Sequence, residues 1–397
     1  MKILQVNNVY ANKSTGKITK QIYDGLTLAG HEALAAYGRG ETFCGKGITR
    51  LCPDWYGKLN SLFSRFTGLA YGGCYLSTSR LINLIKKEKP DVVHLQCING
   101  HFINIYRLIN WLKKNKIKTV VSLHAEFMYT ANCGHAFDCD QWKHGCKKCP
   151  DKRKSTKSWF FDNTEKSWKR MKKAFEGFEN DCVVCPVSLW TEERAKQSDI
   201  LENFKFKTVF NGVDTKVFSF IKGESPAENT VLNVTACFSN EKSHPKGGRY
   251  LTELARRMPH VEFLVAGKTE YVGSLPENLH LLGEISDQSK LAKLYNKAKV
   301  SVLTSQRETF SMPCAESLCC GTPVVGFKAG APEQISLPEY SGFVEYGDVE
   351  KLEALIEKWL EKEDICNKEI SDAAAEAYST ETMIESFIKV YEGILWK

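Results

Sequence analysis

Short apolar runs alternate with segments of helical periodicity along almost the whole chain, and this alternation constrains the fold most. Residues 2–6, 91–95 and 119–123 are near-continuous runs of aliphatic residues bounded by polar ones. Strands that are buried on both faces have this pattern, and they occur in parallel sheets covered by helices. The alternation therefore predicts a parallel α/β architecture.

The predicted elements fall into two sets. The first set has strands at 2–6, 33–37, 91–95, 119–123 and 182–187, with helices at 18–29, 76–87, 103–115 and 166–176. The second set has strands at 231–236, 261–266, 280–282 and 300–303, with helices at 247–257, 289–297, 313–320, 349–360 and 384–395.

A polar stretch at residues 214–230 separates these sets and has the Gly, Pro, Ser and Glu content of a linker. We predict two doubly wound domains that face each other across a cleft, residues 1–214 and 215–378. Residues 379–397 form a C-terminal helix that packs back on the first domain. In such sheets a ligand binds at the carboxyl ends of the strands.

The composition is that of an ordinary globular protein, with 43% hydrophobic and 25% charged residues in a chain of 397. No apolar run approaches the ~18 residues that span a bilayer. Gln5, Asn7 and Asn8 interrupt the first apolar run before it reaches the length of a signal-peptide core. We expect a cytoplasmic protein that is peripheral on the inner face of the membrane.

Residues 143–173 carry 12 Lys and Arg against three acidic residues, whereas the whole chain has a net charge of +7. Aromatic residues lie in or beside the same segment: Trp142, Trp159, Phe160, Phe161 and Trp168. A solvated basic helix with a buried aromatic face explains this pattern, and so does contact with an anionic membrane surface. Nucleic acid is not an expected partner, because no recognition motif accompanies the charge.

Four cysteines lie within 17 residues, in the pattern Cys133-x5-Cys139-x6-Cys146-x2-Cys149. The Cys-x2-Cys end has the spacing with which two thiolates bind one zinc ion. A structural zinc site, free thiols and a redox disulfide are the three alternatives. Most other cysteines have apolar neighbours and are expected to be small buried hydrophobes: Cys44, Cys97, Cys237, Cys314, Cys319, Cys320 and Cys366.

Glu308 and Glu316 are separated by seven residues, with Glu308 in a loop after the strand 300–303 and Glu316 in the helix that Pro313 opens. This Glu-x7-Glu pattern, followed by Gly-Thr-Pro-Val-Val, resembles the retaining glycosyltransferases of family four, which have the GT-B fold. The resemblance extends over nearly the whole chain and is closest to bacterial enzymes that build surface polysaccharides. It includes Ser14-Thr15-Gly16, Asn211-Gly212-Val213-Asp214 and Pro245-Lys246-Gly247-Gly248.

The residue types fit this resemblance. Lys246 precedes a helix, so its ammonium and the helix N-terminus can both meet phosphate oxygens; an exposed lysine at a helix start is the simpler explanation. The resemblance implies that Glu316 binds ribose hydroxyls. It also implies that Glu308 contacts the transferred sugar, and that the backbone N–H groups of Phe310, Ser311 and Met312 cap the phosphate.

Two departures from the family pattern lie in this region. Thr309-Phe310-Ser311 replaces the usual Gly-Phe-Gly. The arginine that commonly precedes the lysine is missing, and Lys242 is the natural substitute.

The first half supplies the other expected site residues. His124 follows the strand 119–123; a histidine there is more often structural, but the resemblance implies contact with the donor sugar. Gly16 is expected in a loop after the first strand, and the resemblance implies that Thr15 and Gly16 line the donor and acceptor cleft. His94 and His101 are expected to be structural.

The resemblance implies transfer of a sugar, without a required metal, from a nucleotide-diphosphate donor to a carbohydrate or a polyprenyl-diphosphate-linked acceptor. Catalytic roles fall to His124, Glu308 and Lys246. The alternatives are a nucleotide-sugar epimerase and a non-catalytic nucleotide-sugar-binding or scaffold protein.

Overall fold

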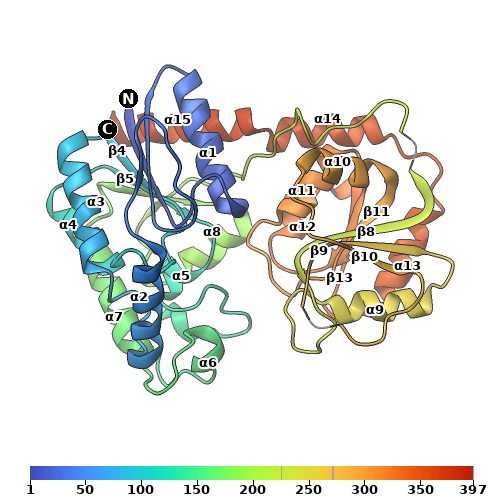
Figure 1. The fold of residues 1–397 in the computed structure, drawn as a ribbon, viewed down its shortest axis with the longest axis horizontal. Coiled ribbons are helices and arrows are strands. Elements are labelled where there is room, and N and C mark those ends of the chain that lie inside the picture. Colours follow the sequence, from blue (N-terminus) through green and yellow to red (C-terminus); the bar gives the residue numbers. More distant parts are fainter. Residues whose placement is uncertain (225, 271, 397) are drawn as a thin grey trace. The chain divides into compact units, whose positions relative to one another are not determined.

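The computed structural model describes residues 1–224, 226–270 and 272–396, apart from the side chain of Lys154, so Ser225 of the predicted linker lies outside the described residues. The chain forms two compact units, residues 1–210 with 383–397 and residues 211–382 (Figure 1). The second unit begins at 211 rather than 215 because Val213 N–H donates to the Tyr378 carbonyl at 2.7 Å.

The first unit contains a seven-stranded sheet in the order β3-β2-β1-β4-β5-β6-β7, in which all neighbouring strands are parallel. The strands are β1 (Lys2–Asn7), β2 (Glu32–Tyr37), β3 (Ile48–Arg50), β4 (Val92–Leu95), β5 (Thr119–Leu123), β6 (Cys182–Pro186) and β7 (Lys205–Phe206). The helices are α1 (Lys13–Leu28), α2 (Asp54–Thr67), α3 (Tyr75–Glu88), α4 (Ile105–Lys114), α5 (Phe127–Thr130), α6 (Lys152–Ser155), α7 (Thr164–Phe175), α8 (Leu189–Lys196) and α15 (Thr380–Leu395), whose last turns close this unit.

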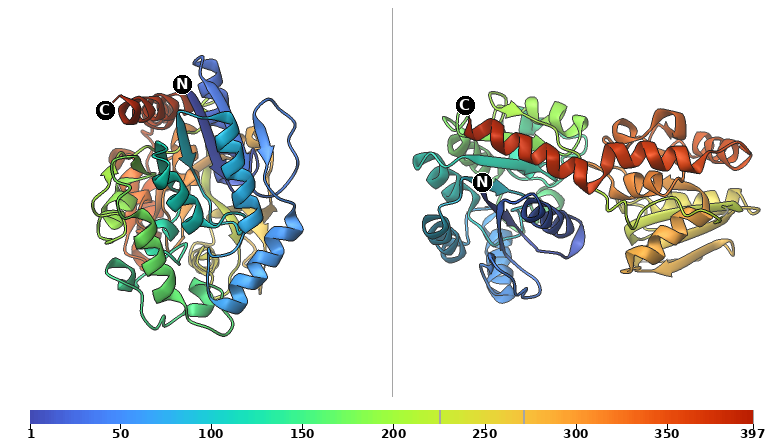
Figure 2. Two further views of the ribbon diagram at one scale, coloured as in Figure 1. Left: turned by 90° about the vertical axis from the view of Figure 1, so that its left-hand side faces the viewer. Right: turned by 90° about the horizontal axis from the view of Figure 1, so that it is seen from above.

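Both faces of this sheet are buried, as its apolar strands predict. Leu4 belongs to a cluster that also includes residues of α3, α4 and α7. Its neighbour Ile3 belongs to a second cluster, formed with α1 and α15. Successive strand residues point to opposite faces, so the two clusters are the two sides of one sheet, and helices cover each side (Figure 2).

The second unit contains a six-stranded sheet in the order β10-β9-β8-β11-β12-β13. Its strands are β8 (Ala227–Phe238), β9 (Glu262–Thr269), β10 (Leu279–Gly283), β11 (Ala298–Leu303), β12 (Val324–Phe327) and β13 (Ser341–Val344). Its helices are α9 (Gly248–Arg257), α10 (Gln288–Lys297), α11 (Met312–Cys319), α12 (Pro332–Ile335), α13 (Val349–Leu360) and α14 (Asn367–Tyr378). The core between α9, α13 and the sheet includes Leu254, Phe263 and Leu352.

The predicted parallel α/β class is therefore confirmed, and most predicted elements lie within two residues of their observed bounds. Elements that the sequence did not predict include β3, α2, α8, β7 and α14. The first predicted helix began too late: α1 starts at Lys13, not at residue 18. Within the described residues, none of the helices combines the length and apolar character that a bilayer crossing needs.

Candidate functional site

The loop between β8 and α9 carries Lys246 and is fixed by the end of β11. Thr304 Oγ1 donates to the Lys246 carbonyl at 2.9 Å, and Gln306 N–H donates to the Pro245 carbonyl at 2.8 Å. Gly247, rather than Gly248, stands at the cap of α9 with φ of +68°. A Cβ at Gly247 would lie 2.1 Å from the Thr304 carbonyl oxygen, so the close approach of the two loops requires glycine there.

Lys246 and Glu308, 62 residues apart, meet as an ion pair with 2.6 Å between Nζ and Oε1. Their side chains are 29% and 21% exposed, respectively. Glu308 is held by backbone bonds on both sides, because its N–H donates to Ala329 and its carbonyl accepts from Ala331. An ammonium has three donors, so Lys246 can keep Glu308 and still bind a second anion from solvent.

Ser311 caps α11 in an unusual conformation for a residue with a side chain, with φ of +81° and ψ of +83°. This is the second position where the family commonly has glycine, so the loop keeps a backbone shape that glycine adopts most easily. Phe310 before it is buried, and its ring centroid lies 6.3 Å from that of Tyr378. Met312 begins the helix, where N–H groups lack intrahelical acceptors and favour anions.

Glu316 lies in α11 and has a partner that no motif indicated. Tyr295 Oη, from α10, donates to Glu316 Oε2 at 3.4 Å. Burial, with the nearby Glu316 charge, raises the pKa of the Tyr295 phenol well above its ordinary value, so this hydroxyl stays a donor. Tyr295 therefore orients one oxygen of the carboxylate that is expected to bind ribose.

Lys242 lies in the same loop as Lys246 and is exposed. Within the described residues, Glu308 forms its ion pair with Lys246 and not with Lys242. The geometry thus brings together Lys246 and Glu308, but it gives Lys242 no contact with them.

Thr15 and Gly16 lie in the first turns of α1, not in the loop that the sequence predicted. The Thr15 carbonyl accepts from Asn7 Nδ2 at 3.0 Å and from Thr19 Oγ1 at 2.8 Å. A Cβ at Gly16 would lie 3.1 Å from Val9 Cγ2 and 3.3 Å from Ala11 N. The close packing of α1 against residues 9–11 therefore favours glycine at this position.

His124 follows β5 and belongs to a chain of polar side chains across the carboxyl ends of three strands. Its Nε2 lies 2.6 Å from Gln96 Oε1, and Gln96 Nε2 donates to Gln5 Oε1 at 3.1 Å. An amide oxygen only accepts, so His124 donates from Nε2. Burial lowers the pKa of His124 to about 4, so the imidazole is neutral at pH 7.

His94 is a buried structural residue, as expected. Its Nδ1 lies 2.7 Å from Tyr391 Oη and its Nε2 lies 2.8 Å from Ser122 Oγ. Burial, with the nearby His124, lowers the pKa of His94 to about 3. His101 is also held neutral near pH 7, since burial lowers its pKa to about 4.

The four clustered cysteines are free thiols in this structure. Cys133 and Cys146 are buried, which raises the pKa of each thiol to about 12, and Cys139 and Cys149 are half-buried. Among the described residues these four do not form a group with ligand atoms within 4.8 Å of one another. The geometry does not support the zinc alternative, which stays a prediction.

Protein contacts hold the start of this cysteine-rich segment. The buried carboxylate of Glu126 accepts from Arg194 Nε at 2.7 Å and from Tyr129 Oη at 2.7 Å. Its other oxygen accepts from Ala136 N–H at 2.5 Å. Since Ala136 lies between Cys133 and Cys139, this network anchors the start of the segment.

Seven other cysteines were predicted to be buried. Cys314, Cys319 and Cys320 are buried, as predicted. The prediction is wrong for the exposed Cys44 and Cys366 and for the half-buried Cys97 and Cys237, because these four lie in loops or near strand ends.

The second unit matches a family model described as glycosyl transferases group 1, over residues 224–377. The chain is 28% identical over 227 residues to the MMP alpha-(1->4)-mannosyltransferase of Mycolicibacterium hassiacum, which covers 51% of this chain and 53% of that protein. The chain thus spans about half the length of that relative. It is 21% identical over 323 residues, 77% of each chain, to WcaC of Escherichia coli, whose name assigns it provisionally as a colanic acid biosynthesis glycosyl transferase.

Solved structures resemble the chain over its whole length. Sucrose-phosphate synthase from Thermosynechococcus elongatus covers 100% of both chains with a TM-score of 0.70 and 14% identity. Anabaena Alr3699/HepE in complex with UDP-glucose covers 99% of this chain and 100% of its own, with a TM-score of 0.63 and 12% identity. These likenesses show the fold, which is the predicted GT-B fold.

Proposed function

We propose that the chain is a retaining glycosyltransferase that uses a nucleotide-diphosphate sugar, because residues 224–377 match the glycosyl transferases group 1 family, as the sequence predicted. The bond between the anomeric carbon and the diphosphate breaks, and the nucleoside diphosphate leaves with the electron pair. An acceptor hydroxyl forms the new bond on the same face of the sugar, and its proton passes to the departing phosphate. The acceptor is a carbohydrate or a lipid-linked oligosaccharide of surface polysaccharide synthesis.

The pairing of Lys246 with Glu308 at 2.6 Å carries this proposal. Both residues follow the carboxyl ends of strands in one sheet, where a doubly wound fold binds its ligand. The leaving diphosphate gains negative charge during transfer, and a fixed ammonium stabilises that charge more than it stabilises the ground state. Glu308 keeps the ammonium in place before the donor arrives.

Other residues of the second unit bind different parts of the donor. The N-terminus of α11, with the N–H groups from Phe310 to Met312, binds the diphosphate. Glu316, oriented by Tyr295, accepts hydrogen bonds from the ribose hydroxyls. Lys242 supplies a second, weaker cation from its exposed position. No metal ion is required at the diphosphate in this mechanism.

His124 and the start of α1, with Thr15 and Gly16, serve the sugar and acceptor side. A neutral imidazole whose Nε2 is fixed by Gln96 presents a defined hydrogen-bonding edge. Neutral groups suit hydroxyl recognition, because they do not repel or trap the charged diphosphate. His124 is therefore a positioning and polarising group and not a titrating base.

A donor panel tests the proposal. The full-length protein is heated with UDP-, GDP- and ADP-sugars, and the shift in melting temperature is followed, because a ligand of the folded state raises stability by RT ln(1 + [L]/Kd). UDP-sugars come first, since the similar HepE structures contain UDP and UDP-glucose. Lys246→Ala and Glu316→Ala should abolish the shift, whereas Lys293→Ala, an exposed lysine of α10, should preserve it.

The same samples distinguish a glycosyltransferase from an epimerase and from a non-catalytic binding protein. Conversion of the donor sugar to an isomer without any acceptor would identify an epimerase. A donor shift without transfer to any acceptor would identify a non-catalytic binding protein. If no donor shifts the melting temperature of a folded sample, the proposed donor site is wrong.

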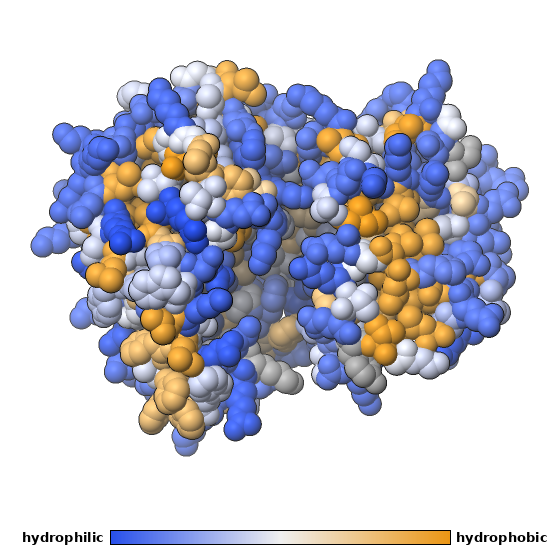
Figure 3. Space-filling model, viewed as in Figure 1, coloured by the Kyte–Doolittle hydropathy of each residue, from blue (hydrophilic) through white to orange (hydrophobic). Residues whose placement is uncertain are grey.

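We also propose that an anionic membrane surface binds the first unit. Five apolar side chains of α2 are 44–61% exposed at helical spacing, namely Trp55, Leu59, Leu62, Phe63 and Phe66. Beside them lie Trp159, Phe160 and Phe161, which are 41–61% exposed. These eight residues form the aromatic face, and Figure 3 shows apolar side chains gathered around α2.

The two parts of the aromatic face are joined. Phe66 has its ring centroid 5.4 Å from that of Trp159 and 5.3 Å from that of Phe160. Trp159 N–H donates to the Arg65 carbonyl at 2.8 Å, and the Arg65 guanidinium lies over the Trp159 ring. By contrast, Trp142 and Trp168 of the basic segment are buried in the core. Trp142 and Trp168 thus fit the expected buried aromatic face, whereas Trp159, Phe160 and Phe161 fit the expected contact with a membrane surface.

Basic side chains lie beside the aromatic face, where they could meet an anionic leaflet. Lys152 Nζ donates to the Phe160 carbonyl at 2.8 Å, and Arg153 and Lys157 follow in the same short segment. Exposed rings at the interface and cations against headgroups act together in peripheral binding. A polyprenyl-linked acceptor would be presented at such a surface.

Vesicle sedimentation tests this interface. Wild-type protein should bind vesicles with phosphatidylglycerol more strongly than vesicles of phosphatidylcholine alone. Replacing Phe160 and Phe161 with Ser, or Lys152, Arg153 and Lys157 with Glu, should each reduce binding. Leu28→Ser, an apolar residue 89% exposed on α1, is the matched control. Equal binding by all variants would contradict the interface.

A further inference from the structure

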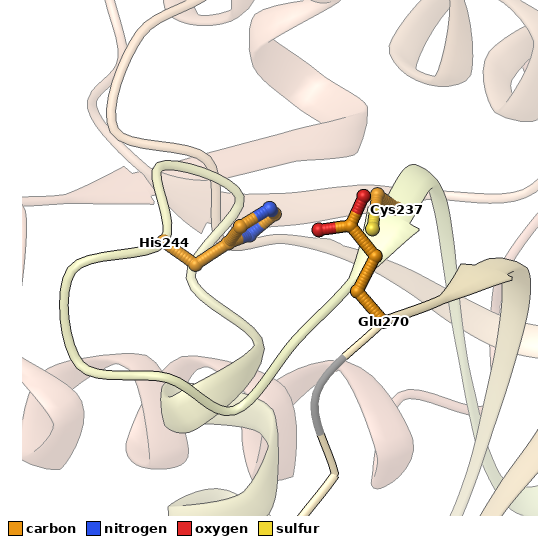
Figure 4. A group of neighbouring side chains, drawn as sticks. All are labelled: Cys237, His244 and Glu270. Carbon is orange, nitrogen blue, oxygen red and sulfur yellow. The ribbon is translucent and has the colours of Figure 1, made fainter. Parts of the chain in front are cut away.

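Three side chains from separate segments of the second unit converge beside the Lys246 loop. Cys237 lies near the end of β8, His244 lies in the loop that follows it, and Glu270 comes directly after β9. The thiol sulfur, an imidazole nitrogen and a carboxylate oxygen all lie within 4.8 Å of one another. Figure 4 shows the imidazole of His244 and the carboxylate of Glu270 directed toward each other, with the sulfur of Cys237 alongside.

The backbone holds two of these residues side by side. Cys237 pairs with Lys268 in the parallel β8–β9 ladder, which places Glu270 next to the end of β8. Glu270 N–H then donates to the Phe238 carbonyl at 3.0 Å. The strand register therefore fixes the positions from which the thiol and the carboxylate extend.

The imidazole of His244 carries one ring nitrogen without a protein partner among the described residues. Its Nδ1 is buried and has no hydrogen-bond partner in the part of the chain that the structure describes. A buried polar atom without a partner is destabilising, because its lost hydration is not replaced. A cation between the three groups would give the imidazole a partner and remove this cost.

The donor set indicates the kind of cation. Thiolate and imidazole are ligands of Zn²⁺ and similar transition metals, whereas Mg²⁺ and Ca²⁺ prefer oxygen alone. Around a tetrahedral zinc ion with bonds of about 2.0–2.3 Å, ligand atoms lie about 3.3–3.8 Å apart. The three ligand atoms lie within 4.8 Å of one another, so they must approach by about 1 Å to bind one ion. Rotation of the exposed Glu270 side chain can supply this movement.

We propose that Cys237, His244 and Glu270 bind a divalent transition-metal ion, Zn²⁺ by its donor set, that fastens the loop 239–247 to the ends of β8 and β9. The ion is structural and is separate from the cysteine-rich segment of the first unit. Gly247 N–H donates to the His244 carbonyl at 3.1 Å, so the metal ligand and Lys246 belong to one turn. The metal holds this turn from one side, and Thr304 and Gln306 hold it from the other.

Metal titration of the full-length protein tests the proposal. The protein is stripped with EDTA, dialysed, and titrated with Zn²⁺ against a chromogenic chelator, and then with Co²⁺ to follow thiolate-to-metal charge-transfer absorption. Cys237→Ser and His244→Gln should each bind one equivalent fewer than wild type. Cys366→Ser, an exposed thiol of the same unit, should bind like wild type. This subtraction isolates the site from any metal held by Cys133, Cys139, Cys146 and Cys149.

A separate control tests whether the variants are folded. In EDTA the variants should have the circular dichroism and melting temperature of wild type, and only wild type and Cys366→Ser should gain stability on adding Zn²⁺. Glu270→Gln, at an exposed position, should weaken this equivalent by at least about 10-fold without affecting the fold. Wild-type stoichiometry and affinity in all three ligand variants would overturn the proposal, whatever the outcome of the donor panel.

Discussion

The two candidate regions differ in how they hold their polar groups. In the second unit, Lys246 and Glu308 are charged, about a quarter exposed, and paired with each other. In the first unit, His124, Gln96 and Gln5 form a neutral hydrogen-bonded chain at the strand ends. Charges near the surface are inexpensive to keep, whereas a buried polar group needs a hydrogen-bond partner and a buried charge needs an opposite charge. The second unit is therefore suited to a diphosphate and the first to uncharged hydroxyls.

Removing the ammonium should have the largest effect. Lys246→Met leaves Glu308 without its partner and the diphosphate without its cation. Loss of one such charge-stabilising donor typically costs about 10²–10³-fold in rate. We expect that loss in kcat/KM, with Lys246→Arg intermediate and Lys293→Ala unchanged. A Lys246→Met enzyme within about 3-fold of wild type would place the anion site elsewhere.

Acid should destabilise the first unit through its buried histidines. The pKa values of His94 and His124 fall to about 3 and about 4 in the folded state, below the ~6.5 of an unfolded chain. The unfolded state therefore binds more protons between these values, so stability falls as pH decreases from about 6.5 toward 4. Each histidine contributes about 1.4 kcal/mol per pH unit, measurable by urea unfolding.

A substitution identifies the source of that slope. His94→Asn should be less stable at pH 7 but should lose less stability on acidification. His280→Gln, an exposed histidine of the second unit, should keep the wild-type slope. Equal slopes in all three proteins would mean that other groups dominate the acid response.

Breaking the neutral chain should have a smaller effect on rate. Gln96→Leu removes the acceptor for His124 Nε2 and the donor for Gln5 Oε1. We expect kcat to fall about 10-fold through loss of orientation, with an unchanged donor-induced shift in melting temperature. Gln96→Glu restores an acceptor for His124 and should recover part of the rate. A lost donor shift in Gln96→Leu would show that the two regions do not work separately.

The smallest expected effect concerns the loop before α11. Ser311 has φ of +81°, so Ser311→Gly should relieve strain and stabilise the protein by about 1 kcal/mol or less. Thr309, at the other position where the family has glycine, is not among the described residues with positive φ, and Thr309→Gly should destabilise. Differential scanning calorimetry distinguishes the two signs.

The sequence predicted the buried strands well because a parallel sheet covered on both faces requires continuous apolar runs. The helix α2 could not be found in this way. Its buried residues are Gly57 and Ser64, while Trp55, Leu59 and Phe63 face solvent, which reverses the pattern that a globular helix shows. The short strands β3 and β7 were missed because they contain only three and two residues.

The candidate site was predictable only where motifs keep local spacing. Glu308, Glu316 and Lys246 were recognised through their neighbours in sequence. Tyr295, Gln96 and the group Cys237, His244 and Glu270 were not, because their partners come from other segments and only the sheet register brings them together. Thr15 and Gly16 were predicted in a loop because glycine weakens a helix, and the cap residue Asn12, although of a favoured type, makes no side-chain bond.

The bond between His94 and Tyr391 joins a central strand to the last helix, 297 residues later. A ribosome releases a chain from its N-terminus onward, and domains generally fold as units during synthesis. The first unit therefore lacks Met383, Phe387 and Tyr391 from its core until the last residues of the chain have been made. Although it is translated first, this unit cannot complete its core before translation ends, and until then His94 lacks the hydroxyl of Tyr391.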